Sequence, residues 1–521
     1  MSLSSRVDAT PTVDARPPLW EHQRRALAVS GDRCNFALFM EQRTGKTRVI
    51  VETVARLNAK GAVRAMLIIA PNEVHYNWLA DELPRWATFH WRGHIWVSNR
   101  ARRASSQDER EALLVRTDEV AVLAVNVEAL RLDDCFAYCA KFMKTYPTML
   151  VIDESQVIAT PGAKQTKRAR ALAPRAAYRR ILTGTPATEN PFQLYSQFAC
   201  LDTSILNFNS YAAFKARYGE WEEGYNYTQG RSFPKLKEDK SGKKLYRNLD
   251  ELRAKIAAHS FRVRRDECAD LPPKIYQKVW FDLTPVQRSA YDQLRDQART
   301  ELRDGRTVTA ALVLTRWVRL QQVASNYWPA ATGLAWHAPC DGEGCEACDH
   351  LGVVEQTTPI MAIDPDNNPR LAAAAKLILE EPGSIIVWAR FHQDVTDVIA
   401  WCASHAVPAV RYDGTVGKED RRQALAGFQG GAARVIVATT GALGRGRDLS
   451  RAKMLIYYSN NFSLEQRLQS EDRAEKLTQI TSTQVIDLVA KNTVDERIVD
   501  ALRNKRSLSA LLAGDPQQDW L

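Results

Sequence analysis

Short apolar runs alternate with amphipathic segments in the first third of the chain, and the same pattern returns after Pro369. This alternation is typical of parallel sheets covered by helices on both faces, so we expect two doubly wound α/β lobes. The strands expected in the first lobe are residues 36–40, 65–70, 121–125, 148–152 and 180–183. Those expected in the second lobe are residues 385–388, 410–412, 435–438, 454–458 and 485–489.

The region between the two lobes has a different pattern. Aromatic and charged residues dominate positions 194–274, and the Gly- and Lys-rich stretch 229–244 predicts an exposed loop. Apolar residues at roughly helical spacing predict helix across 285–325. We therefore expect lobe one at 1–195, an insertion and linker at 196–274, a helical region at 275–360, and lobe two at 361–521.

Polar clusters follow several of the expected strands directly. Gly45-Lys46-Thr47 follows the first strand, Asp153-Glu154 the fourth, and Gly184-Thr185-Pro186 the fifth. Because the carboxyl ends of parallel strands form one edge of a sheet, we expect these clusters to converge and form a ligand site.

Thr44, Gly45, Lys46 and Thr47 have the chemistry of a phosphate cradle. Backbone N–H groups at a helix N-terminus hold phosphate oxygens, Lys46 would meet the β- and γ-phosphates, and the Thr47 hydroxyl would ligate Mg²⁺. The full pattern has a glycine five residues before Gly45, where this chain has Met40. Such a partial motif often arises by chance, so its meaning depends on the motifs downstream.

Asp153 and Glu154 are adjacent carboxylates at the end of an apolar strand. In an ATPase, Asp153 would hold the Mg²⁺ opposite Thr47, and Glu154 would orient or deprotonate the attacking water. The alternative is an ordinary helix cap after a strand. Residues 182–191 carry hydroxyls in a tight turn, which suits a sensor of nucleotide state or a simple Gly/Pro turn.

Further motifs lie before and after these clusters along the chain. They are residues 19–23 with Gln23, 69–72 with Trp78 and Glu82, 264–265, 271–274, 283–287 with Tyr291, 320–325, 385–388, 412–414 with Arg421 and Phe428, 439–449, and 469–479. In this order, the segments resemble helicase superfamily two, and specifically its Swi/Snf-like ATP-dependent DNA translocases. The resemblance spans residues 19–479, nearly the whole chain.

The resemblance implies two RecA-like lobes with ATP and Mg²⁺ between them and DNA across both. The catalytic residues it implies are Lys46, Asp153, Glu154, Arg473 and Lys476. The nucleotide-binding residues it implies are Gln23 as base reader, Thr44, Gly45, Lys46, Thr47, Gly444, Gly446 and Asp448. Candidate DNA contacts are Asn72, Arg390, Thr439 and Thr440.

Lys476 departs from the family's pattern, which has a second arginine at this position. Lysine keeps the charge and loses the bidentate fork. Since an arginine finger can contribute about 10³–10⁵ in rate, we expect slow to moderate ATP hydrolysis unless Arg445 or Arg447 substitutes. Vigorous turnover that is lost in Arg473→Ala and unchanged in Lys476→Ala would contradict a role for Lys476 at the γ-phosphate.

A cysteine cluster in residues 336–352 predicts a small structural zinc loop. Cys345 and Cys348 have the spacing of a zinc hairpin, Cys340 supplies a third ligand, and His350 or His337 the fourth. The alternatives are a loop of reduced thiols or a redox pair.

The formal net charge of +10 fits a chain that meets phosphate backbones and fits a basic enzyme equally well. Residues 1–18 lack the apolar segment of a signal peptide, and no apolar run approaches the ~18 residues of a membrane span. We expect a monomeric cytoplasmic protein of bacterial or bacteriophage type, working with other replication or recombination proteins. The rival functions are a strand-separating DNA or RNA helicase and a nucleic-acid-binding scaffold with weak ATPase activity.

Overall fold

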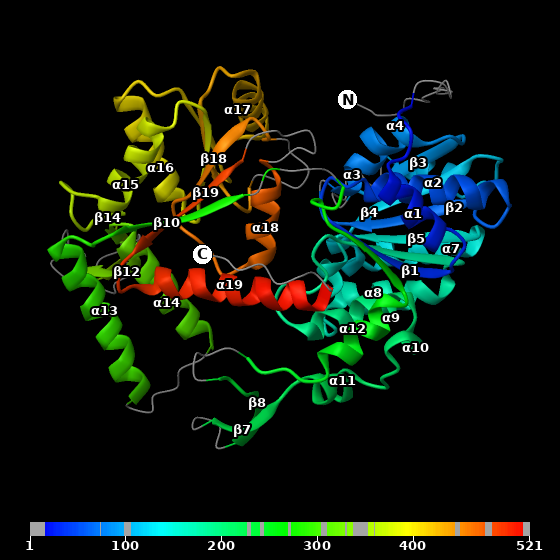
Figure 1. Ribbon diagram of the computed structural model, residues 1–521, viewed down its shortest axis with the longest axis horizontal. Helices are drawn as coiled ribbons and strands as arrows, with labels where there is room; N and C mark the ends of the chain where they lie inside the picture. The colour runs from blue at the N-terminus through cyan, green and yellow to red at the C-terminus, as the bar shows by residue number, and fades with distance from the viewer. Residues whose placement is uncertain are drawn as a thin grey trace.

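The computed structural model describes residues 16–72, 74–97, 106–226, 231–239, 244–268, 272, 274–303, 310–328, 331–336, 353–358, 360–442, 449–474 and 482–513. Two lobes lie side by side, each built on one parallel sheet (Figure 1). Lobe one is built on the seven-stranded sheet and lobe two on the six-stranded sheet. The predicted α/β class with two parallel-sheet lobes is therefore confirmed.

The sheet of lobe one has the strand order β3-β4-β2-β5-β6-β1-β9, and all its neighbours pair in parallel. Its strands are β1 (Asn35–Met40), β2 (Ala65–Ala70), β3 (Trp91–Ile95), β4 (Val120–Asn126), β5 (Thr148–Asp153), β6 (Tyr178–Leu182) and β9 (Ser260–Val263). The five predicted strands are confirmed as β1, β2, β4, β5 and β6. The edge strands β3 and β9 were missed.

Helices cover both faces of this sheet, as the alternation predicted. Leu38 and Met40 of β1 pack in one core with Val49 of α2, while Ala37 and Phe39 pack in the opposite core. Successive side chains of a strand point to opposite faces, so both faces must be apolar here. The helices are α1 (Glu21–Ser30), α2 (Lys46–Ala59), α3 (Val74–Asn77), α4 (Leu83–Trp86), α6 (Gln107–Leu113), α7 (Asp133–Thr145), α8 (Lys164–Leu172) and α9 (Leu194–Leu201).

Residues 196–274 are more ordered than the predicted insertion and linker. They contain α10 (Thr203–Leu206), α11 (Tyr211–Tyr218), β7 (Trp221–Asn226), β8 (Arg231–Leu236) and α12 (Leu249–Ala257) before β9 rejoins the sheet of lobe one. The prediction of a loop over 229–244 was wrong at 231–236, where β8 pairs antiparallel with β7. Residues 229–230 and 240–243 lie outside the described residues.

The sheet of lobe two has the order β10-β19-β18-β15-β17-β16. Its strands are β10 (Ile275–Phe281), β15 (Ser384–Ala389), β16 (Ala409–Tyr412), β17 (Val435–Thr439), β18 (Ala452–Tyr457) and β19 (Gln484–Ala490). Its covering helices are α15 (Pro369–Glu380), α16 (His392–Ser404), α17 (Lys418–Gly430), α18 (Leu464–Asp472) and α19 (Val494–Ala513). All five predicted strands are present, and β10 was missed.

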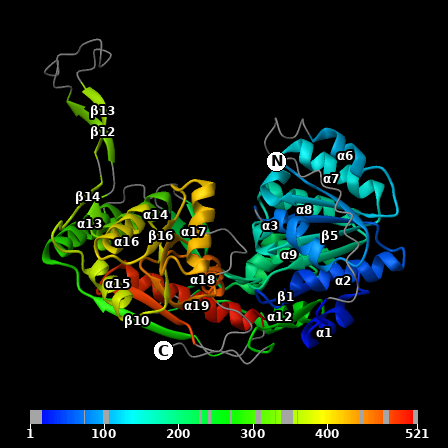
Figure 2. The same cartoon turned by 90° about the horizontal axis from the view of Figure 1, so that it is seen from above.

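The predicted helical region contains α13 (Pro285–Arg303) and α14 (Ala310–Ala324). Two short antiparallel pairs follow: β11 (Tyr327–Trp328) with β14 (Met361–Ala362), and β12 (Ala331–Trp336) with β13 (Val353–Thr358). The β12–β13 pair stands away from the body of lobe two in Figure 2. The zinc loop predicted between these strands, with all its candidate ligands, lies outside the described residues.

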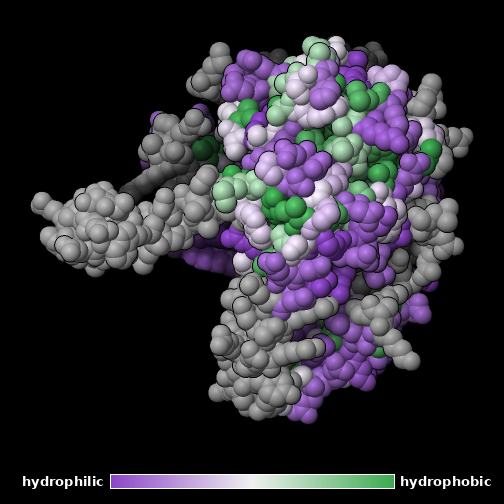
Figure 3. Space-filling model, turned by 90° about the vertical axis from the view of Figure 1, so that its left-hand side faces the viewer, coloured by the Kyte–Doolittle hydropathy of each residue, from purple (hydrophilic) through white to green (hydrophobic). Residues whose placement is uncertain are grey.

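On the face of the molecule in Figure 3, apolar residues are interspersed among hydrophilic ones. Among the described residues, no helix has both the length and the apolar character needed to cross a bilayer. The buried apolar residues instead form cores on either side of each sheet.

Candidate functional site

The loop between β1 and α2 turns sharply at two left-handed residues. Arg43 has φ 67° and Gly45 has φ 85°, after which Lys46 opens α2. The positive φ of Gly45 favours glycine, and a Cβ atom there would lie 2.2 Å from Nε2 of Gln23, so the Gln23 amide would have to move. The predicted phosphate loop is thus a tight turn that delivers the first N–H groups of α2 to one point.

Helix α1 braces this loop from the side. The Gln23 amide donates to the Thr44 carbonyl at 3.1 Å, and its oxygen accepts from the backbone N–H of Trp20 at 3.1 Å. Nε2 of His22 lies 2.8 Å from the same Thr44 carbonyl. Gln23, which the resemblance assigns to the nucleobase, is therefore buried directly against the loop.

Lys46 lies buried at the base of the loop. Its ammonium donates to the carbonyl oxygens of Met40 at 2.8 Å and Glu41 at 3.2 Å. Burial lowers the pKa of Lys46, whereas the nearby carboxylates of Glu154 and Asp153 act to raise it. The three predicted catalytic residues of lobe one therefore share one electrostatic environment.

Asp153 ends β5 with both carboxylate oxygens engaged. Oδ1 accepts from the backbone N–H of Glu154 at 2.9 Å, and Oδ2 accepts from the indole Nε1 of Trp78 at 2.9 Å. Burial and the neighbouring Glu154 carboxylate raise the pKa of Asp153 to about 6, against the Trp78 hydrogen bond and Lys46, which lower it. A divalent cation would stabilise this buried anion.

Glu154 sits in the left-handed region at φ 50°, an uncommon conformation that clusters at functional sites. Two side-chain amides hold its carboxylate: Gln42 donates to Oε1 at 2.5 Å and Gln156 donates to Oε2 at 2.9 Å. Since Gln42 belongs to the phosphate loop, the general-base candidate is fixed relative to that loop.

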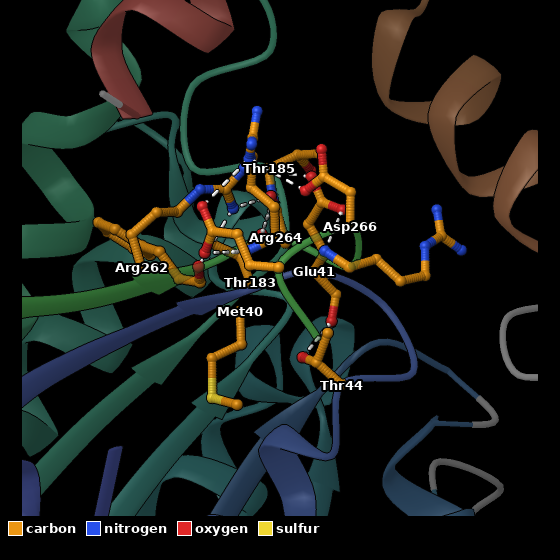
Figure 4. A network of polar contacts seen from close by, with 12 residues as sticks. Met40, Glu41, Thr44, Thr183, Thr185, Arg262, Arg264 and Asp266 are labelled. Carbon is orange, nitrogen blue, oxygen red and sulfur yellow. Dashed lines mark hydrogen bonds and ion pairs between the residues drawn. The ribbon is translucent and has the colours of Figure 1, made fainter. Parts of the chain in front are cut away.

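Trp78 and Arg262 make hydrogen bonds in the site that the sequence did not predict. Trp78 belongs to one of the predicted motifs, but nothing in its local sequence shows that its indole holds Asp153 from a five-residue π-helix (Trp78–Glu82). Arg262 of β9 donates to the carbonyls of Phe39 and Gly184. It also donates to the carboxylate of Glu41, beside which it lies in Figure 4. This arginine joins the phosphate loop to the 182–186 turn, where a Cβ on Gly184 would lie 3.3 Å from the Glu41 Cα.

Lobe two meets this site through α18. Arg43 donates to the Arg473 carbonyl at 3.0 Å, Arg265 donates to the Asp472 carboxylate at 2.7 Å, and Gln156 donates to Glu465 at 3.2 Å. Arg473 is itself buried at this interface. The structure thus brings Lys46, Asp153 and Glu154 together and sets the end of α18 against them.

Several predicted residues lie outside the described residues. These are Gly444, Arg445, Gly446, Arg447, Asp448 and Lys476 of the nucleotide site, and Cys340, Cys345, Cys348, His337 and His350 of the zinc loop. Within the described part of the chain, no group of three or more His, Cys, Asp or Glu side chains could hold a metal ion.

The candidate DNA contacts stand at the carboxyl ends of strands, Asn72 just after β2 and Arg390 just after β15. Thr439 ends β17, and the Thr440 hydroxyl donates to Gln466 at 3.1 Å. The Arg390 guanidinium donates to Gln321, and burial lowers its pKa. Arg390 is therefore engaged inside lobe two, whereas Asn72 is exposed.

The profile of the SNF2-related domain family matches residues 22–327, and that of the helicase conserved C-terminal domain matches residues 370–477. The chain belongs to the SNF2-related family. The SNF2-related match covers α1, the phosphate loop, the Asp153-Glu154 pair and β9, and the helicase C-terminal match covers α18.

The chain is 20–23% identical to the following three proteins. The human SWI/SNF-related matrix-associated actin-dependent regulator of chromatin subfamily A member 1 is 23% identical over 528 residues, covering 97% of this chain and 45% of that protein. An uncharacterized ATP-dependent helicase of Mycoplasma genitalium is 21% identical over 473 residues, covering 90% of this chain and 39% of that protein. The Sulfolobus solfataricus SWI2/SNF2 ATPase core in complex with dsDNA is 20% identical, with 96% and 94% coverage and a TM-score of 0.39. The chain spans less than half the length of these two curated relatives.

Proposed function

We propose that this chain is an ATP-dependent DNA translocase or helicase of the Swi/Snf-like group, which couples ATP hydrolysis to movement along duplex or branched DNA. One observation carries the proposal: Lys46, Asp153 and Glu154 share a buried site at the edge of lobe one, and α18 of lobe two is hydrogen-bonded to that site. A site divided between two lobes converts a change in bound nucleotide into relative movement of the lobes.

Each residue has a role in phosphoryl transfer. The loop N–H groups and Lys46 bind the β- and γ-phosphates and stabilise the charge that develops on them. Glu154 orients the attacking water and takes its proton as the water oxygen bonds to the γ-phosphorus and the bond to the ADP oxygen breaks. Arg473 completes the charge stabilisation from lobe two, with Lys476 as its partner.

Magnesium fits the residues present. Asp153 is a buried carboxylate and Thr47 a hydroxyl in the first turn of α2, a donor set that Mg²⁺ takes together with substrate phosphates and water. When bound, Mg²⁺ neutralises phosphate charge. Asp153 and Thr47 would hold it, and Trp78 keeps the Asp153 carboxylate turned to a fixed position.

Trp78→Phe should make the Mg²⁺ requirement of the ATPase more sensitive to acid. A proton and Mg²⁺ compete for Asp153, so in wild type the Mg²⁺ concentration for half-maximal activity should rise as pH falls through about 6. Phenylalanine keeps the ring and removes the N–H that lowers the pKa of Asp153, so this rise should begin at a higher pH. Mg²⁺ titrations between pH 5.5 and 8 measure the effect.

Trp86→Phe is the matched control, because Trp86 also donates its indole N–H to a carboxylate, that of Glu82, at 3.1 Å. Its Mg²⁺ profile should follow wild type. Superimposable profiles for Trp78→Phe and wild type would contradict the role given to Trp78.

The function is tested by ATPase stimulation with single-stranded DNA, duplex DNA, forked DNA and RNA, each with wild type and Lys46→Ala. Translocation predicts the largest stimulation by duplex or branched DNA and displacement of a triplex-forming strand. Displacement of a duplex strand would instead identify a strand-separating helicase. Nucleic-acid binding with no stimulated hydrolysis in wild type would identify a scaffold and end the proposal.

We further propose that Cys340, Cys345 and Cys348, with His350 or His337, bind a structural zinc ion. The protein purified without chelator should contain about one equivalent of zinc, and a Cys345→Ser/Cys348→Ser variant should lose it, because a closed site needs four ligands. Less than a tenth of an equivalent in wild type would refute the site.

The cytoplasm of a bacterium or of a bacteriophage-infected cell is the compartment we propose, where thiols stay reduced.

A further inference from the structure

Arg43 is a left-handed residue with a long side chain in the middle of the phosphate loop. Its φ of 67° lies in a region that a residue with a Cβ atom rarely adopts, and nearby Gly45 takes the same kind of conformation without that cost. Such a cost persists where the surrounding structure or the function over-determines it. A role of the Arg43 side chain would compensate for this cost.

The Arg43 guanidinium crosses from lobe one to lobe two. It donates to the carbonyl oxygen of Arg473 at 3.0 Å, and the same oxygen accepts from the backbone N–H of Leu449 at 3.0 Å. Arg473 is the C-cap residue of α18. The carbonyls at a helix C-terminus lack intrahelical partners and carry the negative end of the helix dipole, so a cation is well matched to this position.

A second link ties the same end of α18 to the same loop. Arg265 donates its guanidinium to Asp472 at 2.7 Å and its backbone N–H to the Glu41 carboxylate at 3.0 Å. The loop residues Glu41 and Arg43 thus both fix the last turn of α18, one through Arg265 and one directly. These links set the backbone from which the Arg473 side chain projects.

We propose that Arg43 is a positioning residue for Arg473: it holds the end of α18 against the phosphate loop and so places the Arg473 guanidinium for catalysis. This inference rests on the proposed function, because it requires Arg473 to act on ATP bound by the loop. The contact joins the two lobes through the loop itself, so it also makes the arginine of lobe two respond to the conformation of the loop.

Arg43→Gly tests the inference, since it removes the cross-lobe donor and at the same time relieves the left-handed backbone. A loss of activity in this variant cannot come from backbone strain. We expect kcat to fall about tenfold, the scale of one lost hydrogen bond from a charged donor, with the Kd for a fluorescent ATP analogue within about twofold of wild type. Arg43→Lys keeps a cationic donor and should recover part of the loss.

The decisive measurement is the same substitution in an Arg473→Ala background, by single-turnover hydrolysis. If Arg43 acts through the Arg473 side chain, Arg43→Gly should change the rate by less than about twofold there. Arg422→Ala is the control, because Arg422 is an exposed arginine of lobe two that pairs with Glu419. It should behave as wild type in both backgrounds.

Three results would overturn the inference. They are a wild-type kcat in Arg43→Gly, an equal loss in both backgrounds, or a loss confined to ATP binding. Wild-type protein that hydrolyses no ATP with any nucleic acid would overturn the proposed function and this inference with it. An active wild type beside an unaffected Arg43→Gly overturns the inference alone.

Discussion

Glu154→Gln should lower ATP hydrolysis by about 10²–10⁴-fold and leave ATP binding within about threefold of wild type. Glutamine has nearly the same shape and cannot accept the proton of the attacking water. The lost rate is the part that a positioned general base contributes, while the phosphate contacts of Lys46 and the loop remain. Steady-state phosphate release and the Kd for a fluorescent ATP analogue measure the two quantities.

The surroundings of Glu154 explain why the variant should keep its structure. The carboxylate accepts one hydrogen bond from Gln42 and one from Gln156. A glutamine offers one acceptor and one donor, so one of these neighbouring amides must turn its oxygen toward residue 154. Turning Gln156 would give up its hydrogen bond to Glu465, so Gln42 is the amide that we expect to turn, and the melting temperature should be unchanged.

Glu128→Gln is the matched control for this experiment. Glu128 is an exposed carboxylate that follows β4 at the same edge of the sheet and accepts from Asn126 at 3.3 Å. Its ATPase rate should equal that of wild type. Hydrolysis by Glu154→Gln at more than about a tenth of the wild-type rate would assign the proton transfer to another group.

The strands that the sequence predicted best are those buried on both faces. Strand β2 has six buried residues in a row and was predicted to the residue. The missed strands β3, β9 and β10 are at sheet edges, where one neighbouring strand suffices and polar residues interrupt the apolar run. A strand such as β10, with Gln277 and Lys278 in its middle, carries no continuous apolar signal.

The site residues that the sequence predicted are likewise those that lie next to buried strands. Lys46, Asp153 and Glu154 follow buried strands, so the rule that strand ends converge was enough to predict that they meet. Trp78, Arg262 and Arg43 make their contacts with residues far along the chain, and no local spacing encodes such a contact. Arg43 in particular required the left-handed backbone angle and the position of α18, which arise from tertiary packing.

Gly45→Ala should lower kcat/KM for ATP by about a hundredfold. A left-handed backbone costs an alanine about 1–2 kcal/mol. The new Cβ would also fall 2.2 Å from Nε2 of Gln23, so the Gln23 side chain must move and give up its hydrogen bonds to Thr44 and Trp20, each of the order of 1 kcal/mol. A total near 3 kcal/mol shifts the loop away from the conformation that binds ATP, so about one molecule in a hundred remains competent and kcat/KM falls by about the same factor.

Gly61→Ala separates the backbone cost from the local clash. Gly61 lies just beyond the other end of α2 with φ 72°, and no atom lies within 4 Å of the Cβ it would gain. It should therefore lose about 1–2 kcal/mol of stability and keep wild-type kcat/KM. Gln23→Ala removes the same two hydrogen bonds, so Gly45→Ala combined with Gln23→Ala should be no more active than Gly45→Ala alone. Equal kcat/KM values for Gly45→Ala and Gly61→Ala would show that the phosphate loop tolerates a side chain at Gly45. This result would contradict the effect expected from the contact between Gly45 and Gln23 of α1.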